Sequence, residues 1–440
     1  MEMAQMSGVF NQLRLCMDQI TTERNRLLFV WLIFASSFVV IFEPAPTDFF
    51  ILLALLAFLY AGLSTSIVIM PLVLILLFYN FGGFLGFAIV SDSYEARQFV
   101  ITSAFMAVTA VFIASFLTVD TKSRMELIIS GYVFGATIAC CLALLAYVFP
   151  SSVGKVFIGL GANPLISYGR ATGLFKDPNV FSTYLIFPCV LLAQRMLLGT
   201  SRKSLLDFFC FSIIFISLFL AFSRGAWINA ILSTLTMVGL TYMLSESSNT
   251  RGRIVFYSFV GLVIVSSVLF LILSSPVMRA IFLDRFTLVK NYDAGERGRF
   301  GNQINSIPML LQQPFGFGPL QFAKIFGEAP HNTFLNAFAS YGWVGGLSYI
   351  TLACCNLFIG LRTIFTHSPY RNYAILVFAC LAQVTFQGVQ IDTEHWRHFY
   401  WMLGMMWGLF AATVHYTSTL ETEEEIAEIE RPFQEVLGPA

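Results

Sequence analysis

Long apolar segments alternate with short polar segments along almost the whole chain. Each apolar segment is about as long as a helix that crosses a bilayer, and helices satisfy their own backbone hydrogen bonds where lipid offers no water. The pattern therefore predicts about twelve membrane-spanning helices. They are expected at residues 27–43, 47–63, 65–83, 98–118, 125–148, 179–198, 205–221, 226–243, 254–274, 333–360, 373–390 and 398–416.

Two of the polar interruptions are long, at 149–178 and 275–332, and an acidic segment follows the last apolar one. No repeat or low-complexity linker divides the chain. We therefore expect a polar N-terminal segment at 1–26, one membrane domain at 27–416 that includes the second long loop, and an acidic tail at 417–440.

The second long loop contains a helical pattern of its own. Phe300, Ile304, Ile307 and Leu311 recur at helical spacing, which predicts a short amphipathic helix that rests on the bundle or on the lipid surface. The glycine-rich stretch 314–319 then predicts a turn, and it is too short and too hydrophobic to be a nucleotide-binding loop.

Composition narrows the class to an all-α integral membrane protein. Hydrophobic residues make up 57% of the chain, only 11% of the residues are charged, and 47 are Phe. A soluble domain has too little polar surface to cover so much apolar surface. The net charge is zero, so whole-protein electrostatics gives no information about partners. No nucleic-acid partner is expected. The N-terminus shows no cleavable signal peptide, and no cysteine spacing suggests zinc or a disulfide framework.

Basic residues favour an orientation with the N-terminus, and therefore also the tail, in the cytoplasm. The inside segments then hold Arg14, Arg24, Arg26, Lys122, Arg124, Arg195, Arg202, Lys203, Arg251, Arg253, Arg362, Arg371 and Arg431. The short outside loops hold only Arg97, Lys155, Arg170, Lys176, Arg224 and Arg397. In this orientation every polar cluster described below lies on the outer face, which indicates a single site there.

Ser223, Arg224 and Gly225 stand between two apolar segments with almost no loop. An arginine at a helix end often only reaches toward the membrane surface. Alternatively, its planar guanidinium points into a site and holds a diphosphate in two-point contact. Gly225 allows a ligand or a neighbouring helix to approach closely. The sequence leaves both interpretations of Arg224 open.

Arg170 and Lys176 lie in or next to the first long interruption. Asp177 and Pro178 have the pattern of an N-cap followed by proline in the first helical turn, which is a structural role. The two cations have no such role. Each is either simply solvated or in contact with an anion.

His331 and Asn332 open a long apolar segment directly behind the second long loop. A histidine at such a boundary is commonly just an interfacial residue. At the start of a helix, however, the positive end of the dipole favours the neutral imidazole, which can accept a proton from a sugar hydroxyl. Asn332 is then expected to orient His331 or to bind substrate.

The second long loop also carries Arg297 and Arg299 among several carboxylates, a mixture that is typical of a solvated face. A further polar cluster, at 392–398, contains Asp392 and Arg397. Its carboxylates and imidazoles match no ligand spacing, so no metal site is expected.

Four of these stretches together carry a resemblance. Ser223–Trp227, Pro314–Gly318, His331–Leu335 and Tyr341–Gly345 resemble, in order and spacing, the bacterial O-antigen ligase and O-antigen polymerase superfamily. The resemblance covers roughly residues 170–400. Its members are integral-membrane glycosyltransferases that use glycans linked to a polyprenyl diphosphate.

The resemblance implies transfer of a glycan from an undecaprenyl diphosphate carrier to an acceptor hydroxyl, on the periplasmic face of the bacterial inner membrane. It implies that Arg170 and Arg224 hold the donor diphosphate and that His331 is the base or positions the acceptor. The further substrate-binding candidates are Asn332, Arg297, Arg299 and Arg397. The usual aromatic residue after the loop arginine is Phe300 here rather than tryptophan, which weakens the match of that loop.

A lipid diphosphate is already a good leaving group, so no nucleotide and no cofactor is expected. The expected partners are the lipid-linked donor, a glycolipid or glycan acceptor, and membrane lipids. We favour the ligase, whose acceptor is the lipid A–core, over the polymerase, whose acceptor is another lipid-linked unit. A transporter of lipid-linked glycans is the alternative from another class. It would carry ionisable residues at mid-membrane depth, and the apolar segments here are almost free of them.

Overall fold

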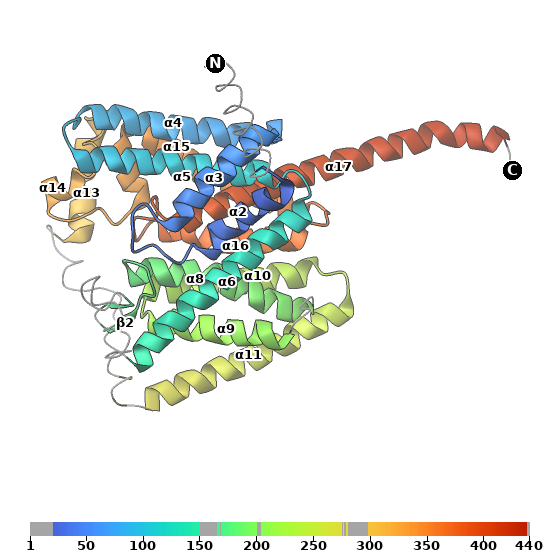
Figure 1. The fold of residues 1–440 in the computed structure, drawn as a ribbon, viewed down its shortest axis with the longest axis horizontal. Coiled ribbons are helices and arrows are strands. Elements are labelled where there is room, and N and C mark those ends of the chain that lie inside the picture. The colour runs from blue at the N-terminus through green and yellow to red at the C-terminus, as the bar shows by residue number, and fades with distance from the viewer. Residues whose placement is uncertain are drawn as a thin grey trace, which may run out of the picture.

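The computed structural model describes residues 21–149, 165–167, 169–199, 204–274, 276, 279 and 298–437. These residues are mostly helical (Figure 1). The first half contains α2 (Glu23–Ala35), α3 (Pro46–Ala61), a 3-10 turn (Ile67–Ile69), α4 (Met70–Ala88), α5 (Tyr94–Phe116), α6 (Thr121–Val148), β1 (Ile166–Ser167), β2 (Arg170–Ala171) and α8 (Pro178–Leu198). The second half contains α9 (Ser204–Leu220), α10 (Arg224–Leu244), α11 (Ser248–Ser274), α13 (Arg299–Leu311), α14 (Phe322–Phe326), α15 (Thr333–Phe365), α16 (Arg371–Gln387) and α17 (Arg397–Leu437).

Every predicted apolar segment overlaps one of these helices, although α2 ends at Ala35, well before the predicted end at residue 43, and the chain is an α-helical, multi-pass membrane protein. Among the described residues, the helices long and apolar enough to cross a bilayer are Ile67–Ala88, Tyr94–Phe116, Thr121–Val148, Pro178–Leu198, Arg224–Leu244 and Thr333–Phe365. Two further apolar helices are shorter, at Pro46–Ala61 and Leu205–Leu220. About twelve crossings therefore stays a prediction.

The helices run back and forth, so that one end of the bundle collects the segments of interest. The β1–β2 hairpin, α13 and α14 all lie at this end, on the left in Figure 1. The starts of α8, α10, α15 and α17 and the end of α16 also belong to it, because consecutive helices alternate in direction. We call it the outer end, in keeping with the predicted orientation.

Two elements differ from the sequence-based expectation. The first long interruption contains a two-stranded antiparallel hairpin, which pairs Ile166 with Ala171 and Ser167 with Arg170. Helix α17 does not stop where the apolar segment ends but continues to Leu437, beyond the body of the bundle (Figure 1). The predicted span ended where the hydrophobic residues end. The tail that follows is rich in glutamate, which is a good helix former, so the helix continues.

Helix α15 is broken near its first third, and the glycine-rich stretch fills the break. Gly342 has φ of 64° and ψ of −164°, which no helix contains. The freed backbone groups pair with the 314–318 loop, since Phe317 N donates to Ala339 O (2.7 Å) and Trp343 N donates to Pro314 O (2.8 Å). Two motifs that are separate in the sequence are thus one interlocked structure.

A small second core holds this outer assembly together. Leu310 of α13, Phe317 and Phe322 pack against Ala339 of α15, apart from the main core of the bundle. The indole N–H of Trp343 donates to Leu310 O (2.9 Å) and ties the end of α13 to the break. The residues after the long loop are therefore mounted on the first part of α15.

A substitution at Gly316 tests whether the 314–318 loop and the break in α15 form one interlocked structure. A Cβ at this position would lie 2.6 Å from the carbonyl oxygens of both Ala339 and Phe338, and φ is +73°. Gly316→Ala is expected to lower the free energy of unfolding by more than the ~1–2 kcal/mol that left-handed backbone costs an ordinary residue. Gly327→Ala is the matched control, because φ is +87° and nothing lies within 4 Å of its Cβ. Thermal unfolding in detergent that shows equal losses for the two variants would contradict the interlock.

Candidate active site

His331 lies directly before α15 and is held there by a carboxylate. Asp392, between α16 and α17, accepts hydrogen bonds from the backbone N–H groups of His331 (3.2 Å) and Asn332 (3.0 Å). The same carboxylate lies 3.5 Å from Nδ1 of the His331 ring, whose side chain is 42% exposed. The φ of His331 is 47°, a strained region that is uncommon outside functional sites and turns. One side of the ring is anchored, and the side chain stays open to the surface.

Asn332 has a structural position. It is the N-cap of α15, and its side-chain oxygen accepts a hydrogen bond from Leu335 N (3.1 Å). The helix begins at Thr333 rather than at His331. Thr333 is fixed in turn to the 388–393 segment, because its N–H donates to Gly388 O (2.6 Å) and its hydroxyl donates to Ile391 O (3.0 Å). This network locks the backbone that presents His331.

Arg299, the first residue of α13, reaches the same place. Its guanidinium donates to the backbone oxygen of His331 (3.0 Å) and also to that of Gln390. The start of α13 is therefore hydrogen-bonded to both chain segments that hold the histidine, the one before α15 and the one after α16. Arg297 and the charged residues before it lie outside the described residues.

Arg170 and Arg224 come together from the other side of the outer end. Arg170, in β2, donates to the backbone oxygen of Ala221 (2.8 Å) and to the side chain of Asn179 at the start of α8 (2.8 Å). Ala221 belongs to the turn that leads into α10, and Ser223 caps that helix. Arg224, half-buried, is its first residue.

Gln387 connects this arginine pair with the histidine. A Cβ on Gly225 would meet the Gln387 amide nitrogen at 3.1 Å, so the glycine allows α16 to approach α10. The Gln387 amide oxygen accepts from Asn229 (2.5 Å) and, less closely, from Thr183 (3.5 Å). Since α16 ends at Gln387 and Gln390 contacts Arg299, one continuous set of contacts joins the segments that carry Arg170, Arg224, Arg299 and His331.

The electrostatics of the site are governed by two carboxyls, those of the half-buried Asp392 and the buried Glu394. Burial, with the neighbouring Glu394 adding to it, raises the pKa of Asp392 to about 7, although His331 and the two backbone N–H groups oppose the shift. Burial also raises the pKa of Glu394. One oxygen of Glu394 accepts from Asn336 (2.5 Å), and the other has no partner in the described part of the chain.

The sequence pointed to the 392–398 cluster but did not identify the role of Asp392. The residue stands 60 positions away from Asn332, to which it bonds, and no local pattern signals such a pairing. The sequence offered one signal of this pairing: a carboxylate follows the end of one predicted helix, and a histidine stands at the start of another on the same face.

Arg397 has a partner that the sequence did not predict. Its Nε and Nη2 donate to the two carboxylate oxygens of Asp48, at 2.9 and 2.7 Å. The two side chains are only 17% and 13% exposed, and the pair ties the start of α17 to the first turn of α3. This bidentate contact with a carboxylate neutralises the guanidinium charge, so we assign Arg397 to the structure of the outer end rather than to the substrate.

If Arg397 has a structural role, removal of its partner should lower the stability of the protein and leave its transfer activity unchanged. Asp48→Ala leaves a buried guanidinium unpaired, which costs about 3–5 kcal/mol. The expected result is a lower apparent melting temperature with normal transfer per folded molecule, and partial recovery of stability in the double variant Asp48→Leu/Arg397→Met. Loss of transfer in Arg397→Met at unchanged stability would return Arg397 to the substrate-binding residues.

The predicted amphipathic helix exists as α13, but it buries its polar face. Asn302 and Ser306 are buried against the protein, whereas Phe300, Ile304, Ile307 and Leu311 are 50%, 67%, 49% and 66% exposed. An apolar stripe that faces away from the protein fits a lipid surface better than packing on the bundle. Of the two positions that the sequence allowed, the structure favours the lipid surface.

Within the described residues, no group of three or more His, Cys, Asp or Glu side chains is arranged to hold a metal ion. The chemical groups that the contacts described above join around His331 are the guanidinium groups of Arg170, Arg224 and Arg299 and the carboxyls of Asp392 and Glu394. Such a set can bind an anion and move a proton.

Comparison with known proteins agrees with this arrangement. Residues 209–350 match the model of a family described as O-Antigen ligase. The matched region runs from α9 past the break in α15 and contains Arg224, Arg299 and His331, while Arg170 and Asp392 lie outside it. No curated protein matches the chain. The O-antigen ligase domain at residues 209–350 supports membership of this chain in the O-antigen ligase superfamily, a group of membrane glycosyltransferase-like ligases and polymerases.

Proposed function

We propose that this protein transfers a glycan from an undecaprenyl diphosphate carrier to an acceptor hydroxyl, on the periplasmic face of the bacterial inner membrane. The observation that carries the proposal is the placement of His331, anchored by Asp392 at 3.5 Å and joined through Arg299 to an end of the bundle rich in arginine. Family membership supports the reaction class.

In the proposed reaction the acceptor hydroxyl attacks the anomeric carbon of the sugar attached to the diphosphate. His331 takes the hydroxyl proton on Nε2, while the Asp392 carboxylate accepts from Nδ1 and stabilises the charge that the ring gains. The bond between the anomeric carbon and the diphosphate oxygen breaks, and its electrons stay on that oxygen. Arg170, Arg224 and Arg299 neutralise the developing charge, so that the lipid diphosphate leaves.

The lipid part of the donor fits the outward apolar face of α13. Arg299 stands at the start of this helix, and the exposed Phe300 and Ile304 follow it directly. A diphosphate near Arg299 would therefore keep its lipid chain close to an apolar surface. The proposed orientation places this helix in the periplasm, so Gln312→Cys, at the exposed polar C-terminus of α13, should react with a membrane-impermeant maleimide added to spheroplasts. Labelling only after lysis would overturn the orientation.

The direct test uses purified protein in lipid vesicles, with lipid-linked glycan and candidate acceptors extracted from the cells that make it. The expected result is a glycosylated acceptor together with free lipid diphosphate. Movement of the intact lipid-linked glycan across the vesicle membrane without transfer would instead identify a transporter.

We favour the ligase over the polymerase, and deletion of the gene separates them. Loss of a ligase leaves long glycan chains on the carrier lipid and bare lipid A–core at the surface. Loss of a polymerase leaves the core capped with single repeat units. The second outcome would change the acceptor but not the donor or the site.

Asp392 gives the reaction a pH dependence. Its carboxylate form orients the His331 ring, and its pKa is raised to about 7, so transfer by the wild type is expected to rise with pH through about 7. Asp392→Asn is expected to flatten this rise and to lower the rate by about 100-fold, the cost of a misplaced catalytic group. A pH–rate profile on the folded variant that keeps the wild-type rise would contradict the role of Asp392.

The same titration has the opposite effect on folding. A carboxyl whose pKa is raised in the folded state stabilises the protein while it is protonated, and this contribution is lost as the pH rises through about 7. Because the ordinary pKa of an aspartate is 3.8, the wild type is expected to lose stability from about pH 4 up to about 7, where its activity begins to rise, and Asp392→Asn is expected to lose this pH dependence of stability.

A further inference from the structure

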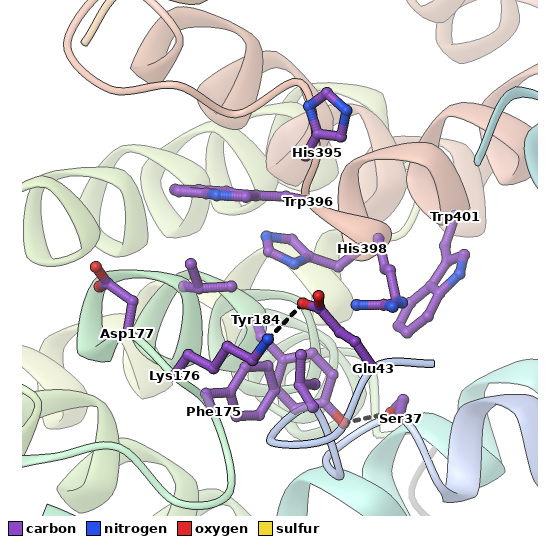
Figure 2. A pocket seen from close by; sticks show the side chains of 13 residues that line it. Ser37, Glu43, Phe175, Lys176, Asp177, Tyr184, His395, Trp396, His398 and Trp401 are labelled. Carbon is purple, nitrogen blue, oxygen red and sulfur yellow. Dashed lines mark hydrogen bonds and ion pairs between the residues drawn. The ribbon is translucent and has the colours of Figure 1, made fainter. Parts of the chain in front are cut away.

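A cavity of about 150 Å³ opens beside the site, between the segment that follows α2 (residues 37–43), the start of α8 and the start of α17 (Figure 2). It shares two chain segments with the site. Asp177, on its rim, accepts a hydrogen bond from the backbone N–H of Asn179, whose side chain bonds to Arg170. Trp396 and His398 follow Asp392 by only a few residues. The cavity is therefore adjacent to the place where the donor and acceptor are proposed to meet.

The cavity has a charged rim and an aromatic interior. Glu43 and Lys176 form an ion pair of 2.6 Å, and their side chains are 63% and 50% exposed. Deeper in, the walls are formed by rings that are almost fully buried, from Phe175, Tyr184, Trp396, His398 and Trp401. Figure 2 shows the His398 ring between Trp396 and the Glu43–Lys176 pair.

Three polar atoms of the lining residues lack a hydrogen-bond partner in the described part of the chain, His395 Nδ1, His398 Nε2 and Trp401 Nε1. His398 is only 2% exposed. Tyr184, by contrast, is satisfied by Ser37 at 2.7 Å. Leaving a buried polar group without a hydrogen bond costs about 1–3 kcal/mol. A ligand hydroxyl in the cavity would supply the bond that His398 Nε2 lacks.

Charge excludes the diphosphate as the occupant. Both cations of the lining are already neutralised, Lys176 by Glu43 and Arg397 by Asp48. Asp177 adds a negative charge at the rim. The cavity lining thus offers no unopposed positive charge to a diphosphate.

Size and lining then define the ligand. A cavity of ~150 Å³ is large enough for one six-membered ring. Aromatic walls pack against the C–H faces of a ring, and a few polar groups fix its orientation. We propose that this cavity binds one uncharged sugar ring of the glycan substrates, as a subsite beside the transfer site. The inference rests on the proposed function for the identity of the glycan.

Chemical modification of Lys176 measures whether the cavity is occupied, and this measurement does not require glycan transfer. We expect acetylation of Lys176 by an amine-reactive ester to slow severalfold when sugar fills the cavity, with Lys122, exposed at the opposite end of the bundle, as the internal reference. Two probes are added separately, the water-soluble glycan released by mild acid from the extracted donor, and the delipidated acceptor oligosaccharide. Whichever probe protects Lys176 identifies the source of the ring.

Matched variants sharpen the result. Val40 lines the cavity, so Val40→Trp is expected to fill it and abolish protection, while Val119→Trp, exposed at the opposite end, keeps it. His398→Phe keeps a ring but removes the polar atom, and is expected to raise KM for the protecting substrate by about 2- to 10-fold, the cost of one hydrogen bond.

The outcomes test the proposed sugar binding in the cavity separately from the proposed catalytic role of His331. If neither probe protects Lys176, or if Val40→Trp is protected as well as the wild type, the cavity holds only water and the proposal is overturned. If protection occurs but His331→Ala still transfers glycan, the subsite stands and the catalytic assignment fails.

Discussion

Replacement of His331 by alanine is expected to lower glycan transfer by about 100- to 10,000-fold, the usual contribution of a general base. The backbone at this position is held by Asp392 and Arg299 independently of the ring, so the variant should fold and insert normally. The measurement is transfer of extracted lipid-linked glycan by purified protein at equal amounts.

His367→Ala is the matched control. This histidine also flanks α15, but at the opposite end, where its side chain is 75% exposed and 3.9 Å from Glu246. It should transfer glycan at the wild-type rate. Near-normal product from His331→Ala would refute the role of His331 as the base.

Arg224→Ala is expected to lower transfer by about 100- to 1,000-fold, the typical cost of removing one group that stabilises transition-state charge. Arg224→Lys is more informative, because it keeps the charge and removes the planar fork that holds a diphosphate at two points. Comparable losses in the two variants would support two-point contact.

Arg251→Ala serves as the control for charge, since Arg251 is exposed near the start of α11, at the opposite end of the bundle. Full activity of Arg224→Lys would argue against the fork, and full activity of Arg224→Ala would remove Arg224 from the site.

The sequence predicted the helices well because burial in lipid depends on a local property, the run of apolar residues. It also located α13, whose 3.6-residue periodicity is local too, and that helix starts at Arg299 and ends at Leu311 as the spacing of Phe300 and Leu311 suggested. The side on which α13 turns its apolar face was not predictable, because the answer depends on what packs against Asn302 and Ser306.

The sequence predicted only part of the candidate site. The contacts that it did not reveal join residues that lie far apart in the chain. The Arg170, Arg224 and His331 segments meet at one end, as their common face predicted. The sequence did not reveal that Asp48 engages Arg397, because the partners lie 349 residues apart. Nor did it reveal that Asn332 caps a helix while Asp392 holds the histidine. Buried ion pairs and caps depend on which helix ends become neighbours, and periodicity within a segment does not encode that.

The break at Gly342 divides α15 into two mechanical units. The longer part, toward Phe365, packs among the other helices and must follow the bilayer when its thickness changes, by tilting or bending. The short outer part carries the residues next to His331 and is fastened to the 314–318 loop by its own hydrogen bonds. Because the backbone is not helical at Gly342, we expect tilt of the longer part to reach the histidine only weakly, which would make its position less sensitive to hydrophobic mismatch. Membranes of different thickness can then host the same geometry at the outer end.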